Sequence, residues 1–502
     1  MTMHRMASRR HTWRTAVGGG LMAATMILGG VAGIAAQDAT PDAIQSGSGA
    51  DATPEGVAAA ATPAALEAGS LTQARPYLVP AEGSSVTITP LLTSGEMVGD
   101  YQMAGVPDGL GAYKDGNDVV LYVNHELTPE EDENLSSARV SRLVLDATTG
   151  AVKSGRYVLD GTEGYERLCS ASLAGPEVGF DQPVFLTGEE ATGGAKGGLV
   201  LGIDGATGKV TEMPWLGHFA HENQVVVPGF QNKTVVLLGD DNSKGSELYL
   251  YVADSPADIM SGKGQLFVFK GDNASGTADI AKGDELSGSF VPVDQASNVD
   301  PDTLQAAVDE ADAFRFVRVE DVTYDRTNTT TVYFADTGDD QEPNLATPTG
   351  QPLTANGRVY SMTLDPSDPT KVTAFKVLID GDAGDDIRNP DNLDATASTL
   401  MIQEDINGYN RAENSEAVGR LLAYDFASGT ITPVAQIDQS DDPNLLVDAG
   451  DKAGSWESSG VIDVSSIFGE GTFLVDVQAH SLKVPQFGKE DEGGQILLLK
   501  TS

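Results

Sequence analysis

The chain has very little cysteine and few basic residues, and both shortages restrict what it can do. Cys169 is the only cysteine, so no intramolecular disulfide can form. There are 31 basic residues against 74 acidic ones, which gives a formal net charge of −43. So acidic a surface repels nucleic acid and anionic membranes, and we expect neither as a partner. Beyond the amino-terminal segment, no apolar run is long enough to span a membrane.

The amino terminus predicts export from the cytoplasm. Arg9 and Arg10 precede a stretch without acidic residues, rich in glycine and alanine, which ends in small residues near Ala36. This pattern predicts a twin-arginine signal peptide over 1–36, with the twin-arginine export machinery as a partner; a retained membrane anchor is the alternative. Residues 37–70 contain almost no large apolar side chains, so we expect a flexible linker there. One domain would then cover 71–502 of a secreted, periplasmic or cell-surface protein.

Long helical periodicity is also scarce, and its best stretch runs from Pro301 to Asp312. By contrast, three segments alternate apolar and polar residues around a turn of the form Asp-x-x-Thr/Ser-Gly, and a looser copy covers 358–372. The three segments are 141–152, 198–210 and 419–431. Alternation is typical of strands, and Asp and Gly supply turn chemistry, so each segment is a predicted hairpin. Many short hairpins without disulfides indicate an all-β fold, a β-propeller with long loop insertions and few short helices; a large sandwich is the runner-up.

Acidic residues recur in tight groups, several of which directly follow predicted apolar strands. The six groups lie at 124–126, 188–190, 218–223, 318–321, 389–392 and 403–405. Neighbouring carboxylates repel one another unless solvent or a cation relieves the repulsion. One such group is most often a solvated loop, but six of them, in loops that a propeller gathers on one face, favour a centre of several metal ions. Cys169 alone would be a buried small hydrophobic residue; beside these groups it becomes a candidate metal ligand.

In their order along the chain, these motifs resemble the PhoX-type alkaline phosphatases. The resemblance covers about 107–404 and includes Val-Asn-His-Glu at 123–126, the unique cysteine, Glu-Glu at 189–190, His-Glu at 221–222, Arg-x-Glu-Asp at 318–321 and Pro-Asp-Asn at 390–392. The chain departs from the family in lacking tryptophan between 171 and 183, and its motifs at 456–460 and 476–480 look like features of a subgroup. The resemblance implies an exported β-propeller enzyme with iron and calcium in its active site, and a cysteine that binds iron.

Donor chemistry suggests how the metal ligands divide. Cys169, Glu189 and Glu222 suit ferric iron, because a thiolate is a reasonable ligand for iron and an unsuitable one for calcium. Four further residues offer only oxygen donors and suit calcium: Glu126, Glu320, Asp391 and Asn392. Glu190 completes the expected metal ligands, and the assignment of each carboxylate to an ion stays open.

The same motifs also suggest roles for one arginine and two histidines. Arg318 would hold phosphate oxygens as a planar fork of donors, and it is with Glu320 our candidate for catalysis. His125 and His221 are expected to orient ligands rather than to bind metal, because the neighbouring glutamates can fill the coordination sites.

The sequence therefore predicts a secreted, metal-dependent phosphatase, monomeric, that hydrolyses small phosphate monoesters at an iron and calcium cluster. A metal cluster can carry phosphoryl transfer without a protein nucleophile, since the reaction needs mainly positioning and charge neutralisation. Two alternatives stay open. One is a phosphodiesterase or phytase-like relative, and the other is a catalytically silent, calcium-stabilised propeller that acts as a binding module.

Overall fold

The computed structural model describes residues 65–128, 137–242, 246–339, 354–406, 417–440 and 455–501. The predicted signal peptide and most of the predicted linker lie outside the described residues. The chain divides into two units, Met1–Ala59 and Ala60–Ser502, and every described element belongs to the second unit. Within the described residues, no helix has the length and apolar character needed to cross a membrane.

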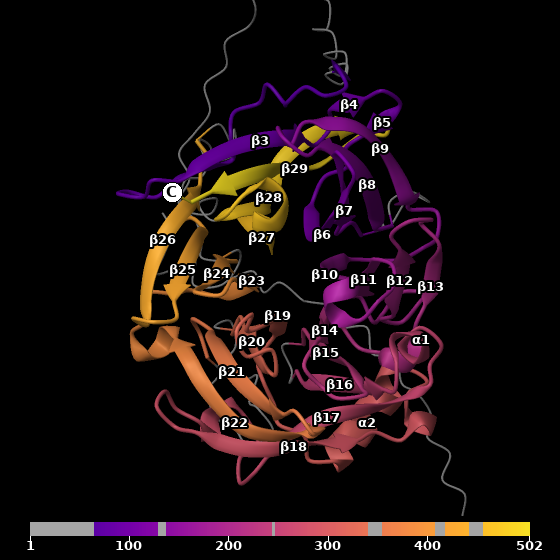
Figure 1. Cartoon of the computed structure of the whole chain (residues 1–502), viewed down its shortest axis with the longest axis vertical. Helices are drawn as coiled ribbons and strands as arrows, with labels where there is room; N and C mark the ends of the chain where they lie inside the picture. The colour runs from indigo at the N-terminus through magenta and orange to yellow at the C-terminus, as the bar shows by residue number, and fades with distance from the viewer. Residues whose placement is uncertain are drawn as a thin grey trace, which may run out of the picture. The chain divides into compact units, whose positions relative to one another are not determined.

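The strands of the described residues form six antiparallel blades around a central axis (Figure 1), which confirms the predicted β-propeller. From the innermost strand outward, blade 1 is β6 (Pro107–Asp115), β7 (Asp118–His125), β8 (Arg139–Asp146) and β9 (Val152–Leu159). Blade 2 is β10 (Leu168–Ala174), β11 (Val184–Glu189), β12 (Val200–Asp204) and β13 (Val210–Glu212). Blade 3 is β14 (His221–Val227), β15 (Thr234–Asp240), β16 (Leu248–Ala253) and β17 (Gly264–Gly271).

Blades 4 to 6 complete the ring. Blade 4 is β19 (Val319–Tyr324), β20 (Thr331–Asp336), β21 (Arg358–Asp365) and β22 (Asp368–Asp380). Blade 5 is β23 (Pro390–Ala395), β24 (Thr399–Glu404), β25 (Arg420–Asp425) and β26 (Thr430–Ile437). Blade 6 is β27 (Trp456–Asp463), β28 (Thr472–Gln486), β29 (Lys489–Lys500) and β3 (Thr87–Thr93). The strand β18 (Leu286–Pro292) pairs with both β17 and β22 and so joins the outer edges of blades 3 and 4.

The remaining elements are short. Three small strands, β1 (Ala65–Leu66), β4 (Met97–Val98) and β5 (Tyr101–Gln102), form a separate sheet. The described helices are α1 (Pro256–Ile259), α2 (Pro301–Glu310), α4 (Ser465–Phe468), and the 3-10 turns η1 (Pro176–Val178), η2 (Pro214–Leu216), η3 (Thr277–Asp279), η4 (Gln295–Ser297) and η5 (Gly381–Ala383).

The predicted hairpins are confirmed as the β8–β9, β12–β13, β25–β26 and β21–β22 pairs of four different blades. Their turns work as the sequence indicates, because an aspartate carboxylate accepts backbone N–H groups two or three residues later. Asp146 accepts the N–H groups of Thr148 and Thr149 at 3.0 Å, and Asp425 accepts that of Ser428 at 2.7 Å. The predicted helix at 301–312 is α2, with Asp300 as its N-cap.

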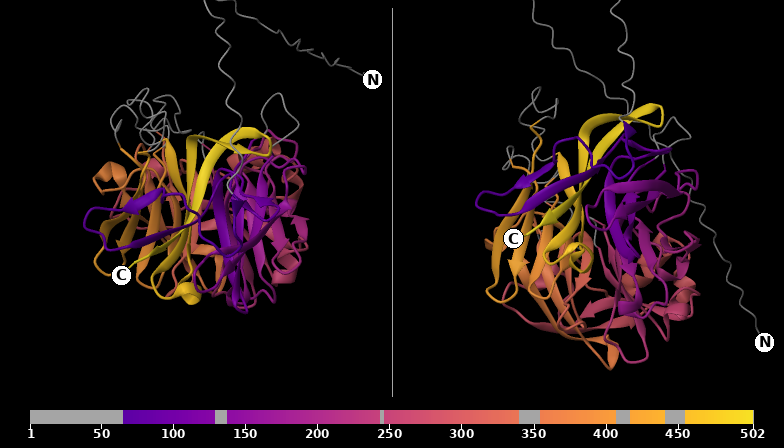
Figure 2. Two further views of the ribbon diagram at one scale, coloured as in Figure 1. Left: turned by 90° about the horizontal axis from the view of Figure 1, so that it is seen from above. Right: turned by 45° about the horizontal axis from the view of Figure 1, so that its top comes forward.

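The amino-terminal strands close the ring. The strand β3 pairs with β29, the last strand of the chain, and buries Leu91 and Leu92 completely. The strand β2 (Leu78–Pro80) likewise adds to the outer edge of blade 5 through β26. At one face of the ring, β28 and β29 extend past the ends of neighbouring strands (Figure 2).

Hydrophobic clusters lie between successive blades. The largest aromatic group packs Phe269, Phe314, Phe316, Phe334 and Phe375 beside blades 3 and 4. Strands such as β15, buried along their whole length, read as continuous apolar runs because both of their faces are covered. The packed blades leave the axis itself to the polar residues of the innermost strands.

Candidate metal centre

Each innermost strand places its second residue at the same end of the central channel. These six residues are Asp108, Cys169, Glu222, Glu320, Asp391 and Glu457. The second strands of four blades add the residue that follows their last position: Glu126, Glu190, Asp241 and Asp405. All of these except Asp108 line one cavity of about 210 Å³, together with Arg167, Arg318, Gln478 and His480.

A repeated backbone device produces this convergence. The residue directly before the innermost strand has a positive φ in four blades, at Val106 (47°), Arg167 (49°), Arg318 (62°) and Asn389 (45°). Non-glycine residues rarely adopt this left-handed conformation, and such strain concentrates at functional sites. In the same four blades the pairing register shifts within the next few residues. Such bulges re-aim the side chains beside them, here at the end of the strand where the acids gather.

The ligand atoms fall into four groups whose members lie within 4.8 Å of one another. Two groups contain the thiol of Cys169: one with Asp108 and Glu126, the other with Glu190 and Glu222. The thiol donates a hydrogen bond to Asp108 at 3.1 Å. The two remaining groups hold only carboxylates: Glu222, Asp241 and Glu320, and Asp391, Asp405 and Glu457.

Electrostatics show that this arrangement needs positive charge. Burial, and then the neighbouring acids, raise the pKa of Glu222 and of Asp391 well above the ordinary values. Burial and the charges of Asp108 and Glu126 likewise raise the pKa of the Cys169 thiol. Neither carboxylate oxygen of Glu222, nor Oδ1 of Asp108, has a hydrogen-bond partner among the described residues, although all three atoms are buried. Buried charges without partners are costly, so these residues fit bound cations, with sulfur available in two of the groups and oxygen in all four.

Two arginines enter the cavity from blades 2 and 4. The guanidinium of Arg167 lies 2.7 Å from Glu126 and 2.6 Å from Glu190. That of Arg318 lies 3.0 Å from Asp241 and 2.8 Å from Glu320. Arg318 and Glu320, the predicted catalytic pair, are therefore in direct contact at the wall of the cavity.

The sixth blade contributes residues from the motifs at 456–460 and 476–480. Gln478 donates to Asp108 at 3.0 Å and to Glu126 at 3.1 Å. Nδ1 of His480 lies 2.7 Å from Glu492, and its Nε2 lies 3.5 Å from Glu457. Burial acts to lower the pKa of His480, but the two glutamates outweigh it and raise the pKa to about 10.

Most of the predicted site residues meet at this cavity, but two do not line it. The carboxylate of Glu189 accepts the N–H groups of Glu166 at 2.9 Å and Gly198 at 3.0 Å. Asn392 donates to Ser170 at 2.9 Å and accepts from Ser459 at 3.0 Å. The residues that line the cavity as expected are Glu126, Cys169, Glu190, Glu222, Arg318, Glu320 and Asp391.

The two histidines of the motifs are buried beside the cavity rather than in its wall. His125 lies 3.0 Å from the Gly105 carbonyl and 2.7 Å from the Ser141 hydroxyl. His221 contacts the Gly217 carbonyl at 3.2 Å. Their orienting role stays a prediction.

Several cavity residues were not among the predicted ligands: Arg167, Asp241, Asp405, Glu457, Gln478 and His480. A signal for Asp241 was present, because Asp240 and Asp241 follow the apolar run of β15 just as Glu189 and Glu190 follow that of β11. In both pairs the first acid ends the strand opposite the start of the innermost strand, and the second lines the cavity.

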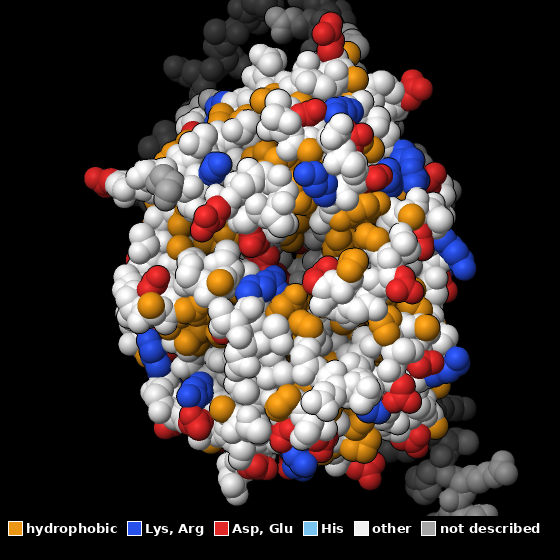
Figure 3. Space-filling view, in the orientation of Figure 1, with side chains coloured by type: hydrophobic (Ala, Val, Ile, Leu, Met, Phe, Trp, Pro, Cys, Tyr) orange, Lys and Arg blue, Asp and Glu red, His pale blue; other side chains and the backbone are white. Residues whose placement is uncertain are grey.

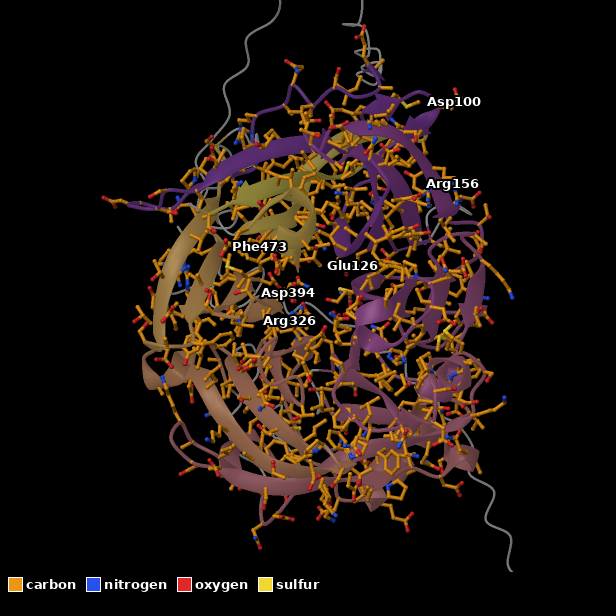
Figure 4. The ribbon with its side chains drawn as sticks, in the orientation of Figure 1. Asp100, Glu126, Arg156, Arg326, Asp394 and Phe473 are labelled. Atoms are coloured by element: carbon orange, nitrogen blue, oxygen red, sulfur yellow. The ribbon has the colours of Figure 1, made fainter. Side chains whose placement is uncertain are left out.

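A second, larger cavity of about 620 Å³ lies toward the other ends of the innermost strands. Its lining includes Tyr324, Arg326 and Asp394, and Arg326 pairs with Asp394 at 2.6 Å. Figure 3 shows a hollow near the middle of the viewed face with acidic and basic side chains at its edge, and Figure 4 places Arg326 and Asp394 there. Glu126, also labelled in Figure 4, lies close to the centre of the ring, by the innermost strand β6.

Comparison with known proteins gives a matching family model and several similar solved structures. A family model described as alkaline phosphatase PhoX matches residues 178–446. The structure of Pseudomonas fluorescens PhoX in complex with vanadate, a transition state analogue, aligns with a TM-score of 0.60 at 15% identity, over 85% of this chain and 96% of that one. A glycosyl hydrolase from Bacteroides ovatus aligns with a TM-score of 0.33 at 8% identity, over 66% of this chain and 87% of that one. No curated protein matches the sequence.

Proposed function

Because the chain belongs to the PhoX alkaline phosphatase family, whose model matches more than half of its 502 residues, we propose that it hydrolyses phosphate monoesters at a centre of iron and calcium. The family makes it a metal-dependent phosphoric ester hydrolase. One observation carries the proposal for this chain. Six innermost strands bring five carboxylates and one thiol to the same end of the channel, beside two guanidinium groups.

The donor sets suggest where each metal binds. Iron is assigned to the groups around Cys169, because sulfur is a reasonable ligand for iron and calcium requires oxygen. Glu190 and Glu222 share one of these groups with the thiol. Calcium is assigned to the two groups that contain only carboxylates, those of Glu320 and Asp391. The bound cations would supply Lewis acidity and neutralise the charge of the transferred phosphoryl group.

The residues of the chain have their own tasks in this proposal. Arg318 is fixed by two carboxylates, so its guanidinium is oriented before substrate arrives and can donate to phosphoryl oxygens. Glu320 holds that guanidinium in place and shares a group with Glu222. An acidic protein can accept an anionic substrate here because cations reverse the local sign of the field.

Export is part of the same proposal. We assign 1–36 to a twin-arginine signal, 37–70 to a linker and 71–502 to the catalytic domain of a monomeric, exported enzyme. The support is the paired Arg9 and Arg10 and the apolar stretch behind them.

The function is tested on protein exported by its native route, by elemental analysis together with hydrolysis of a chromogenic phosphate monoester. We expect at least one iron per chain, calcium in addition, and loss of turnover when a calcium chelator is added. Less than one iron per chain, with no phosphatase activity after reconstitution with both metals, would contradict the proposal.

Cys169→Ser tests the iron assignment. A hydroxyl is a much poorer iron ligand than a thiolate, so we expect iron and any visible absorption band to be lost together with turnover. Calcium content and the melting temperature in calcium should stay close to those of the parent protein. Unchanged iron content in the variant would show that the thiol is a buried small side chain instead.

A further inference from the structure

Arg167 and Arg318 occupy equivalent places in two blades. Each directly precedes an innermost strand, each has a positive φ, and each lies between two carboxylates of the same cavity. A non-glycine residue in this conformation costs on the order of 1 kcal/mol. The repetition of so strained a position at two arginines, on either side of blade 3, sets these two side chains apart from the surface arginines.

The contacts of Arg167 leave one edge of its guanidinium open. Nε and Nη2 bind Glu126 at 2.8 Å and 2.7 Å, and Nη2 also lies 2.6 Å from Glu190. Within the described part of the chain, Nη1 makes no hydrogen bond. The side chain of Arg167 is 42% exposed, whereas those of Glu126 and Glu190 are 11% and 6% exposed. The two carboxylates therefore hold Nε and Nη2, and Nη1 is left to bind a ligand at this cavity.

We propose that Arg167 is a second phosphate-binding residue that acts with Arg318, which enters the same cavity from blade 4. A guanidinium presents parallel N–H groups that match two oxygens of a phosphate. Two such groups favour a terminal phosphate, which carries two negative charges and three unesterified oxygens, over a phosphodiester with one charge and two. The proposal rests on the proposed function and names the residue that would make the site prefer phosphate monoesters over phosphodiesters.

The test compares Arg167→Gln, Arg167→Lys and the control Arg326→Gln in the metal-loaded protein. Arg326 is also paired with a carboxylate and partly exposed, but it lies at the other cavity. Calorimetry gives the affinity for inorganic phosphate, and kinetics give kcat and KM for a chromogenic monoester and the matching diester. Elemental analysis and melting temperature report whether each variant keeps its metals and its fold.

We expect Arg167→Gln to weaken phosphate binding by about 10- to 100-fold, as for a lost hydrogen bond to a charged group. Its preference for monoester over diester should fall, with metal content unchanged. Arg167→Lys keeps the charge without the fork and should lie between Arg167→Gln and the parent. Arg326→Gln should bind phosphate as the parent does.

Two results would overturn this role without touching the proposed function. One is phosphate affinity unchanged in both Arg167 variants, and the other is loss of metal in both, which would make Arg167 a structural counter-ion. If Arg167→Gln does not fold, Arg167→Lys decides alone. A parent protein that is loaded with metal yet neither binds phosphate nor hydrolyses the monoester would instead refute the proposed function, and this proposal with it.

Discussion

The two acids of an adjacent pair make different contacts in this chain. In the Glu189-Glu190 and Glu404-Asp405 pairs, the first carboxylate binds groups beside the innermost strand, and the second lines the cavity. Glu404, for example, accepts the N–H of Arg388 at 2.9 Å. Asp336 ends β20 in the same way and accepts the N–H of Val317 at 3.1 Å. These strand-ending acids are thus part of the scaffold that fixes the start of the innermost strands in blades 2, 4 and 5.

Asp336 gives a prediction about pH. Burial raises the pKa of Asp336 to about 7, above the ordinary value of 3.8. Between pH 4 and 7 this carboxyl therefore keeps its proton in the folded state and loses it in the unfolded state. Its contribution lowers the free energy of unfolding as pH rises through this range. Asp336→Asn removes that dependence. Between pH 4 and 7 the free energy of unfolding of the variant should therefore rise relative to that of the parent by up to about 4 kcal/mol. Urea unfolding at several pH values measures the difference.

Asp425→Asn is the matched control for this experiment. Hydrogen bonds from Ser428 lower the pKa of Asp425, so its stabilising effect is complete above the ordinary carboxyl value and is lost only at lower pH. The slope between pH 4 and 7 should therefore match that of the parent. If the unfolding free energies of Asp336→Asn and the parent change with pH in the same way, Asp336 titrates normally in the folded protein.

Some cavity residues could be predicted from the sequence and others could not. Glu190 and Glu222 could be predicted because they belong to the Glu-Glu and His-Glu motifs, and both line the cavity. Glu189 and Glu190 could not be told apart, because the direction of a side chain at a strand end depends on a bulge that leaves no sequence signature. Glu457 and His480 reach the cavity only because blade 6 closes the ring.

At the scale of single elements, hairpins were predictable and innermost strands were not. Outer hairpins such as β8–β9 carry both alternation and turn chemistry, since one of their faces is partly exposed. The innermost strand β10 reads Leu-Cys-Ser-Ala-Ser-Leu-Ala, with small residues where neighbouring blades come close and no alternation to detect. The recognisable hairpins are also unevenly spaced along the chain, so the number of blades could not be counted from the sequence.

Gly109 tests the close approach of two innermost strands. A Cβ at this position would lie 2.4 Å from the backbone nitrogen of Ala171 and 2.6 Å from the carbonyl oxygen of Cys169. Gly109→Ala should therefore push β6 from β10, lower the unfolding free energy by about 1–3 kcal/mol, and separate Asp108 from the Cys169 thiol. We expect a lower melting temperature and reduced iron content.

Gly193→Ala is the control for this variant, because a Cβ there meets no atom within 4 Å and its φ is not positive. It should melt as the parent does and keep its metals. If Gly109→Ala also behaves as the parent, the contact between β6 and β10 does not set the position of the ligands.

At the scale of the whole molecule, the proposed metal centre depends on the ring being closed. The candidate ligands come from all six blades, so opening the ring between blades 6 and 1 would move Glu457 and His480 away from Asp108 and Glu126. Closure rests on β3, which pairs with β29 from Thr87↔Lys500 to Thr93↔Gln495. Iron and calcium content should therefore report on closure as directly as the melting temperature does.

A truncation and a circular permutation together test this dependence. A protein that starts at residue 71 keeps β2 and β3 and should fold and load metal, whereas one that starts at residue 95 lacks both strands. Burial of Leu91 and Leu92 alone is worth about 3–6 kcal/mol, a large part of the 5–15 kcal/mol typical of a folded domain.

In the permuted protein, residues 95–501 are followed by a short turn and then 87–94, which restores β3 beside β29 because Thr87 and Lys500 are paired. We expect the short truncation and the permuted protein to bind metal, and the long truncation to lose metal and melt at a much lower temperature. A long truncation that loads metal normally would show that the six blades hold the centre without their amino-terminal strand.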